Sequence, residues 1–167
     1  MKETDYLLGN EKIIDDLKKM PIFGPFNQDE LQTLLNMSRL RTYTSGEEII
    51  QEGAVDPWVY FLLYGKVRIT KKKKHIMLMR RRGDVFGEMR FVDNSPRSAT
   101  AIAVDDVACI AVDTEYVDKL AGNDKMAFGY ILYRVFSEIL AERLRAVTKE
   151  LIEIKGKDAI TFWKKND

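Results

Sequence analysis

The 167-residue sequence predicts an α+β domain that is mainly β, with helices on both sides of a central β unit. Apolar residues recur at helical spacing in residues 10–37 and again after residue 113. Between them, residues 41–113 form short β-branched and aromatic runs that glycines interrupt. Many short strands at even spacing are typical of a sandwich or a barrel that closes on itself.

Two short helices are expected near the N-terminus. The first spans about residues 10–20, and Pro21 should end it because proline cannot continue a helix. Residues 27–30 read Asn-Gln-Asp-Glu, a capping box with Asn27 as the cap of the second helix. The apolar side chains expected to be buried by these helices are Ile13, Ile14, Leu17, Met20, Leu31, Leu34, Leu35 and Met37.

The β unit is expected to be built from short strands and tight turns. Residues 59–64 and 67–70 are two apolar runs with strand character. Glycines stand at turn-like places between such runs, at Gly46, Gly53, Gly65 and Gly83. Cys109 lies inside the apolar run 107–112 and is interpreted as a small core residue.

Composition excludes several classes of protein. The chain has 27 basic and 26 acidic residues, so a net charge of +1 gives no global argument for binding nucleic acid. A single cysteine allows no intrachain disulfide, which favours a reducing cytoplasm. Apolar runs fall short of the roughly 20 residues of a membrane span. One histidine and the lack of nucleophile–base or phosphate-loop motifs predict that the chain is not an enzyme and holds no catalytic metal.

Residues 86–100 carry the strongest functional signal. Gly87 lets the backbone adopt a conformation that other residues resist and approach a ligand closely. Arg97 enters an apolar strand, where a buried guanidinium needs an acidic partner. The planar fork of Arg97 fits two oxygens of a phosphate, and Glu88 could accept hydrogen bonds from sugar hydroxyls. A purely structural ion pair between Glu88 and Arg97 is the alternative.

Phe-Gly-Glu at 86–88 followed by Pro-Arg-Ser-Ala-Thr at 96–100 resembles the phosphate-binding cassette of the cyclic nucleotide-binding domain family. The resemblance covers roughly residues 21–154 and implies an eight-stranded jelly-roll barrel. It divides the chain into an N-terminal helical segment (1–26), a cyclic nucleotide-binding domain that includes a long C-terminal helix (27–155), and a short charged tail (156–167).

The resemblance also implies a ligand site. Arg97 would take the cyclic phosphate, Glu88 the ribose 2′-hydroxyl, and the apolar pair Ile69 and Leu78 the purine. Thr148 could bond an edge of the base, either of its own ligand or of the ligand in a partner subunit. The cassette residues implied in binding are Gly87, Glu88, Met89, Arg90, Arg97, Ser98 and Ala99. Plainer alternatives are core packing for Ile69 and Leu78, a strand hydroxyl for Ser98 and a helix surface for Thr148.

Three residues depart from the family pattern. Arg90 stands where a small residue is usual, Arg80 where a leucine commonly lines the pocket, and Val147 where the helix usually carries a hydroxyl. If the two arginines point outward, the site is unchanged. If they point inward, they favour a more anionic ligand or fill the pocket of a module that binds no ligand.

A short helix is expected at 114–120, followed by a long helix that starts near residue 123 and runs past residue 151. Its apolar residues step by four and three, which is heptad spacing. This stripe favours a two-helix homodimer seam, and packing onto the barrel is the alternative. The residues of the stripe are Leu140, Leu144, Val147, Leu151 and Ile154.

Together these observations predict a sensor that binds a cyclic nucleotide, cAMP rather than cGMP, and moves its C-terminal helix against an unidentified effector protein. The alternative is a ligand-free dimerising module with a degenerate pocket. About a dozen residues follow the long helix, too few for a helix-turn-helix, so direct DNA binding is not expected. The basic runs 71–74 and 80–82 form either a solvated hairpin or a patch that attracts nucleic acid or acidic lipid.

Overall fold

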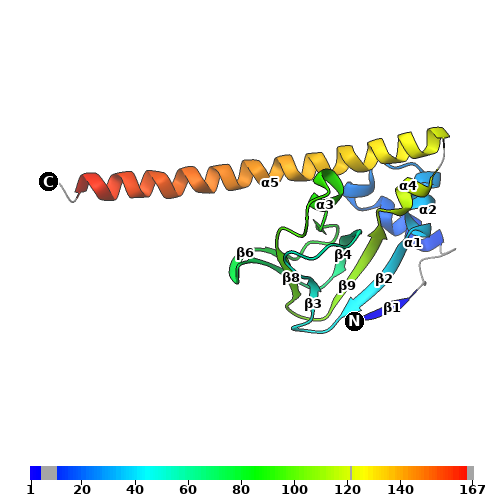
Figure 1. The fold of residues 1–167 in the computed structure, drawn as a ribbon, viewed down its shortest axis with the longest axis horizontal. Helices are drawn as coiled ribbons and strands as arrows, with labels where there is room; N and C mark the ends of the chain where they lie inside the picture. The colour runs from blue at the N-terminus through cyan, green and yellow to red at the C-terminus, as the bar shows by residue number, and fades with distance from the viewer. Residues whose placement is uncertain (5–10, 121, 165–167) are drawn as a thin grey trace.

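The computed structural model describes residues 1–4, 11–120 and 122–164. Within them, two antiparallel sheets face each other, short helices cover one end, and a long helix runs across the barrel and beyond it (Figure 1). In chain order the elements are β1 Lys2–Thr4, α1 Glu11–Lys18, η1 Pro21–Phe23, α2 Gln28–Asn36, β2 Ser38–Tyr43, β3 Glu48–Ile50, β4 Trp58–Tyr64, β5 Val67–Lys71, β6 Lys74–Met79, β7 Val85–Phe86, α3 Met89–Asp93, β8 Thr100–Ala103, β9 Val107–Asp113, α4 Tyr116–Lys119 and α5 Gly122–Lys164.

The two sheets confirm the mainly β prediction. One has the strand order β1-β2-β9-β4-β7 and the other β3-β8-β5-β6. Strands β2 to β9 make up the eight strands expected of the jelly roll. The sequence did not predict β1, which pairs antiparallel with β2 at the sheet edge through the register Lys2↔Thr42.

The predicted capping box is confirmed. The Asn27 side chain accepts the Glu30 N–H at 2.9 Å, and the Glu30 carboxylate accepts the Asn27 N–H at 2.7 Å. Helix α2 then buries Leu31, Leu34 and Leu35, as expected. Leu17 from α1 joins the same cluster. Ile13 lies among the side chains that the structure does not describe.

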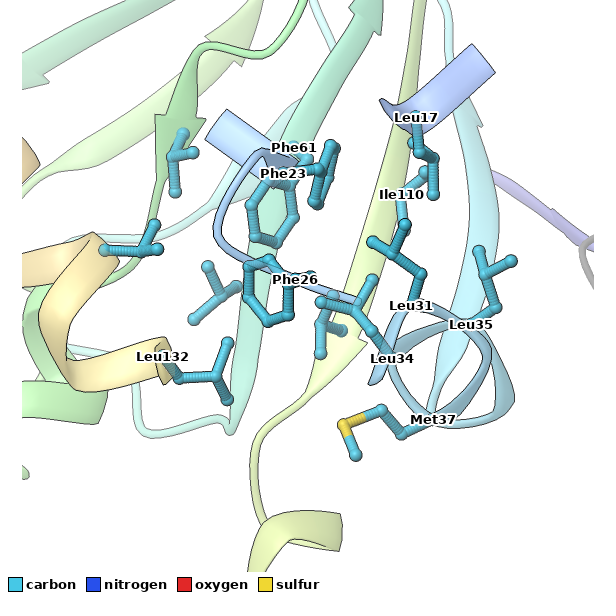
Figure 2. Packing of buried hydrophobic residues seen from close by; sticks show 14 of the residues in the cluster. Leu17, Phe23, Phe26, Leu31, Leu34, Leu35, Met37, Phe61, Ile110 and Leu132 are labelled. Atoms are coloured by element: carbon cyan, nitrogen blue, oxygen red, sulfur yellow. The ribbon is translucent and has the colours of Figure 1, made fainter. Parts of the chain in front are cut away.

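Strand β4 separates two apolar clusters, because successive side chains of a strand point to opposite faces. Val59 and Phe61 pack against the helices, together with Phe23 and Leu132 (Figure 2). Tyr60 and Leu62 point the other way, into the space between the two sheets. Fully buried Cys109 lies in this second cluster, which confirms its interpretation as a core residue.

Helix α5 begins at Gly122, close to the predicted start, and continues to Lys164, through much of the segment that the sequence analysis treated as a tail. Its first part packs on the domain, whereas its last turns project past the barrel (Figure 1). The alternative that the heptad stripe packs on the barrel is wrong for four of its residues: Leu144, Val147, Leu151 and Ile154 are exposed. None of the described helices has the length and hydropathy needed to cross a membrane.

Candidate functional site

The connection between β7 and β8, which contains α3, holds the cassette residues that the sequence analysis singled out, and Gly87 opens it. Its φ of +83° lies in the region that glycine adopts without strain. A Cβ at this position would lie 2.7 Å from Nη1 of Arg97 and 3.0 Å from the Trp58 carbonyl oxygen. The close approach that requires glycine here is therefore to the Arg97 guanidinium.

Arg97 is 4% exposed and every part of its guanidinium is engaged by the protein. Nε donates to Oδ2 of Asp56 at 2.9 Å, and Nη1 donates to the Gly87 carbonyl at 2.7 Å. Nη2 donates to Oδ1 of Asp56 and to the Trp58 carbonyl. The expectation that a buried Arg97 needs an acidic partner is confirmed, and in this structure that partner is Asp56.

Asp56 stands in the loop before β4, where its Oδ1 also accepts the Trp58 N–H at 3.1 Å. Burial on its own would raise the pKa of Asp56, but the hydrogen bond and positive charge of Arg97 outweigh burial and hold that pKa below its ordinary value. Asp56 is therefore a carboxylate near neutral pH. It presents to Arg97 the same paired-oxygen geometry that a phosphate would.

Glu88 is 2% exposed and is paired with the long helix. Arg143 of α5 donates one guanidinium nitrogen to the Glu88 carboxylate and the other to the Val85 carbonyl. Because Glu88 and Arg97 each have a different charged partner, the alternative of a direct structural pair between them is not what the structure shows. The Glu88–Arg143 pair joins the cassette to α5.

A second contact between cassette and long helix is aromatic. Phe91 of α3 lies with its ring centroid 4.7 Å from that of Tyr133 and 5.3 Å from that of Phe136, the latter edge to face. Such pairs contribute about 0.5–1.5 kcal/mol beyond the area they bury. Any movement of α3 must therefore break or carry along its packing on α5.

The other cassette residues lie around this turn. Met89 is 43% exposed, and the Ser98 hydroxyl donates to its sulfur at 3.3 Å. Ala99 is partly buried and directly precedes β8. Nη1 of Arg90 donates to the carbonyls of residues 94 and 95 at 3.3 and 3.2 Å, so this side chain closes its own turn. Arg80 is exposed, with its backbone N–H donating to Asp84.

The register of β5 and β6 does not agree with the expectation that Ile69 and Leu78 face the purine together. Ile69 pairs with Met77, and both pack against the cluster between the sheets. Leu78 pairs with Arg68 and is 43% exposed. Since alternate residues of a strand face opposite sides, Met77 rather than Leu78 shares the inner face with Ile69. The structure therefore does not place Leu78 on the inner face beside Ile69, as the resemblance implied.

Thr148 lies on the exposed part of α5, in a shallow groove with Leu144 and Ile152. It is five residues beyond Arg143, which is the last residue of α5 seen to bond the cassette. The structure thus does not bring Thr148 to the cassette of its own chain.

Sequence reasoning missed three residues of this site: Asp56, Arg143 and Met77. A signal existed for Asp56, since an aspartate two residues before a strand is typical of a side chain that bonds its own backbone. Arg143 lies in the predicted long helix, five residues before Thr148, which the family resemblance implied could bond the base. Its partner, however, lies 55 residues away in the sequence.

A jelly roll that carries a buried arginine and a buried glutamate on one connection between strands, with a long helix packed against that connection, is typical of a regulatory ligand-binding domain. The sequence profile described as "Cyclic nucleotide-binding domain" matches residues 40–124 of this chain. The chain belongs to the cyclic nucleotide-binding domain family, whose members are typically regulatory rather than catalytic.

Relatives and solved structures agree with this assignment. The chain is 29% identical over 139 residues to the cyclic AMP receptor protein of Thermus thermophilus, covering 81% of this chain and 62% of the receptor. It is 25% identical over 129 residues to a cGMP-dependent protein kinase of Eimeria tenella, covering 77% of this chain but only 12% of the kinase. The chain thus spans less than two thirds of either relative.

The catabolite activator protein of Thermus thermophilus superposes with a TM-score of 0.65 at 27% identity, over 81% of this chain and 63% of that one. A putative cyclic nucleotide-binding protein of Geobacter metallireducens superposes with a TM-score of 0.69, over 78% of this chain and 96% of that one. At 17% identity the second match shows the shared fold alone.

Proposed function

We propose that this chain is a cyclic nucleotide sensor, with cAMP preferred over cGMP, in which the ligand controls the position of α5. The observation that carries the proposal is the pair of buried ionic groups on one turn: Arg97 at 4% exposure and Glu88 at 2%. A phosphate and a sugar hydroxyl are the chemical partners that such a pair accepts. The identity of 29% to a cyclic AMP receptor supports the preference for cAMP.

Ligand binding at Arg97 is proposed to be an exchange of anions. In the structure, Nε and Nη2 of Arg97 bond the two carboxylate oxygens of Asp56. The cyclic phosphate offers the same two-oxygen edge to the planar guanidinium and takes over part of this bonding. The cost of unpairing Asp56 is limited because its side chain is 31% exposed and can be rehydrated.

Binding at Glu88 is proposed to reach α5 directly. A ribose hydroxyl that donates to the Glu88 carboxylate competes with Arg143 for the same oxygens. Weakening this pair leaves the contact of Phe91 with Tyr133 and Phe136 as the main tie between α3 and the helix. The ligand then shifts α5 by as much as its affinities for the two helix positions differ.

The projecting part of α5 is proposed to form a homodimer and to be read by an effector protein. Leu144, Val147, Leu151 and Ile154 are 48–67% exposed and follow heptad spacing. A second copy of the helix would cover this stripe. In such a pair, Thr148 of one subunit would be available to the ligand of the other.

The test is a calorimetric titration with cAMP and with cGMP, together with thermal melts. Ligand at about 100 times its dissociation constant should stabilise the fold by about 2.7 kcal/mol. Arg97→Ala should abolish binding. Arg134→Ala is the matched control, because Arg134 lies on α5 with its guanidinium paired to Glu138 and outside the cassette, and it should bind normally.

The ligand-free dimerising module is the second candidate, favoured by the engagement of Arg97 with Asp56 and of Glu88 with Arg143. It predicts a flat response of the wild-type protein to both nucleotides. Equal binding by the wild-type protein and by Arg97→Ala would refute the proposed ligand pose while leaving ligand binding itself intact.

A further inference from the structure

The near-zero net charge of this chain conceals a strongly segregated distribution. Residues 66–82, named here the basic hairpin, contain nine of the 27 lysines and arginines and no aspartate or glutamate. The rest of the chain therefore has 18 basic and 26 acidic residues, a net charge of −8. The nine are Lys66, Arg68, Lys71, Lys72, Lys73, Lys74, Arg80, Arg81 and Arg82.

The basic hairpin consists of β5, β6 and their connections, and β6 is the last strand of its sheet. In Figure 1 it protrudes from the barrel on the side away from the N-terminal helices. Lys72 and Lys73 form its two-residue turn with φ of 49° and 64°. Asparagine and glycine are preferred in such turns. Lysine at both positions therefore strains the backbone but places positive charge at the tip.

The side chains of the tip are not neutralised within the fold. Glu52 accepts the backbone N–H of Lys72 at 2.9 Å, and Asp105 lies 3.4 Å from the ammonium of Lys66 at the base. Asp84 accepts two backbone N–H groups, those of residues 80 and 81. Within the described part of the chain, no carboxylate lies within ion-pair distance of the ammonium groups of residues 71–74.

The same strand exposes apolar side chains. Ile76 is 55% exposed and Leu78 is 43% exposed, close to the lysines of the tip and beside Arg68. Lysines on an edge strand also protect against edge-to-edge aggregation. That explanation, like a simply solvated hairpin, accounts for the lysines but not for the exposed isoleucine and leucine among them.

We infer that the basic hairpin is a docking surface for a membrane of anionic phospholipid. Cationic side chains are attracted to the headgroups, while an exposed apolar side chain enters the boundary between headgroups and acyl chains. Nucleic acid would satisfy the charges, but its phosphate backbone offers nothing to Ile76. The inference uses the outward-facing side chains of the hairpin, whereas Ile69 and Met77 face the inner cluster, so it does not rest on the proposed nucleotide binding.

The test is flotation of the full chain with vesicles of phosphatidylcholine alone and of phosphatidylcholine with about 30 mol% phosphatidylserine. Binding is expected only to the anionic vesicles and should weaken as salt is raised. Replacing Lys71, Lys72, Lys73 and Lys74 by Gln should weaken it on the order of 1,000-fold. The matched control replaces Lys2, Lys18, Lys19 and Lys155, which are also exposed, and should have a much smaller effect.

Ile76→Ser separates a membrane from a nucleic acid. It should weaken vesicle binding severalfold, whereas Met126→Ser, which changes an exposed apolar residue outside the basic hairpin, should not. Circular dichroism melts check that each variant is folded. The inference is overturned by failure to bind anionic vesicles, by equal losses in the two lysine variants, or by tight binding of duplex or single-stranded nucleic acid that Ile76→Ser leaves unchanged.

Discussion

The two parts of α5 differ in how their apolar side chains are covered, although they form one continuous helix of 43 residues. Before Arg143, the buried residues Phe128, Leu132, Val135 and Phe136 pack on the domain. After it, the large apolar side chains that the structure describes, Leu144, Val147, Leu151, Ile152 and Ile154, are exposed. At about 1.5 Å per residue the helix is roughly 65 Å long, more than one small barrel can cover. The first part is therefore a structural element of the domain, and the second part has a surface suited to a partner.

The largest effect is expected from truncation in the covered part. Phe136 is 1% exposed and contacts Phe61 and Phe91. Phe136→Ala should lower the free energy of unfolding by about 3–5 kcal/mol, as removal of a buried aromatic ring usually does. Leu151→Ala, in the exposed part, should change the stability of the monomer by less than about 0.5 kcal/mol. Urea denaturation at low protein concentration measures both changes. Equal losses of unfolding free energy in the two variants would mean that the two parts of the helix do not differ in packing.

The next effect concerns the proposed dimer seam. Leu144→Ser combined with Leu151→Ser should raise the dimer dissociation constant on the order of 100-fold or more, since each leucine contributes roughly 1.5–3 kcal/mol when buried. Sedimentation velocity over a concentration series gives this constant. Ile152→Ser is the matched control, because Ile152 is 66% exposed but lies outside the heptad stripe. If only Ile152→Ser weakens the dimer, the seam lies on another face of the helix. If the wild-type chain is a monomer, the proposed dimer is wrong.

A smaller effect is expected where the two parts of the helix meet. Arg143→Ala leaves the Glu88 carboxylate buried without its charged partner and should cost about 1–3 kcal/mol. A double-mutant cycle with Glu88→Gln isolates the pair, and the coupling energy should be clearly favourable. If the ligand acts on α5 through the Glu88–Arg143 pair, nucleotide binding should change the protection of α5 less in Arg143→Ala than in the wild type. Hydrogen exchange of the helix measures this protection. Additive losses in the cycle would mean that the pair does not connect cassette and helix.

The features that the sequence predicted are those set by local chemistry. The capping box of Asn27 and Glu30 needs only three residues of spacing, and the heptad stripe is visible within one helix. The burial of Arg97 was expected because the arginine directly precedes an apolar run; the structure buries it as expected but places it three residues before β8, not within the strand. Each of these depends on neighbours along the chain, and for this reason each could be found without a structure.

The features that the sequence did not predict depend on tertiary contacts. Asp56 and Arg97 are 41 residues apart, so no spacing rule pairs them. The run 75–79 reads His-Ile-Met-Leu-Met, apolar on both faces of the strand, and thus could not show that Met77 faces inward and Leu78 outward. Strand β1 consists of three exposed residues without apolar periodicity, and only its pairing with β2 defines it.

The smallest effect is expected at the end of the cassette that does not touch α5. Arg97 holds the pKa of Asp56 below its ordinary value near 4, so Asp56 adds stability that is fully present above about pH 4 and is lost as the pH falls through the lowered pKa. Asp56→Asn should therefore be less stable than the wild type by about 1–2 kcal/mol at neutral pH, and the difference should vanish in acid. Urea denaturation over a pH series tests this expectation.

The protection of α5 in Asp56→Asn can be measured by hydrogen exchange at neutral pH. Because Asp56 bonds Arg97 and not Arg143, this variant should leave the protection of α5 unchanged, in contrast to Arg143→Ala; a pH-independent difference, or a loosened helix, would show that the two ends of the cassette are not separate.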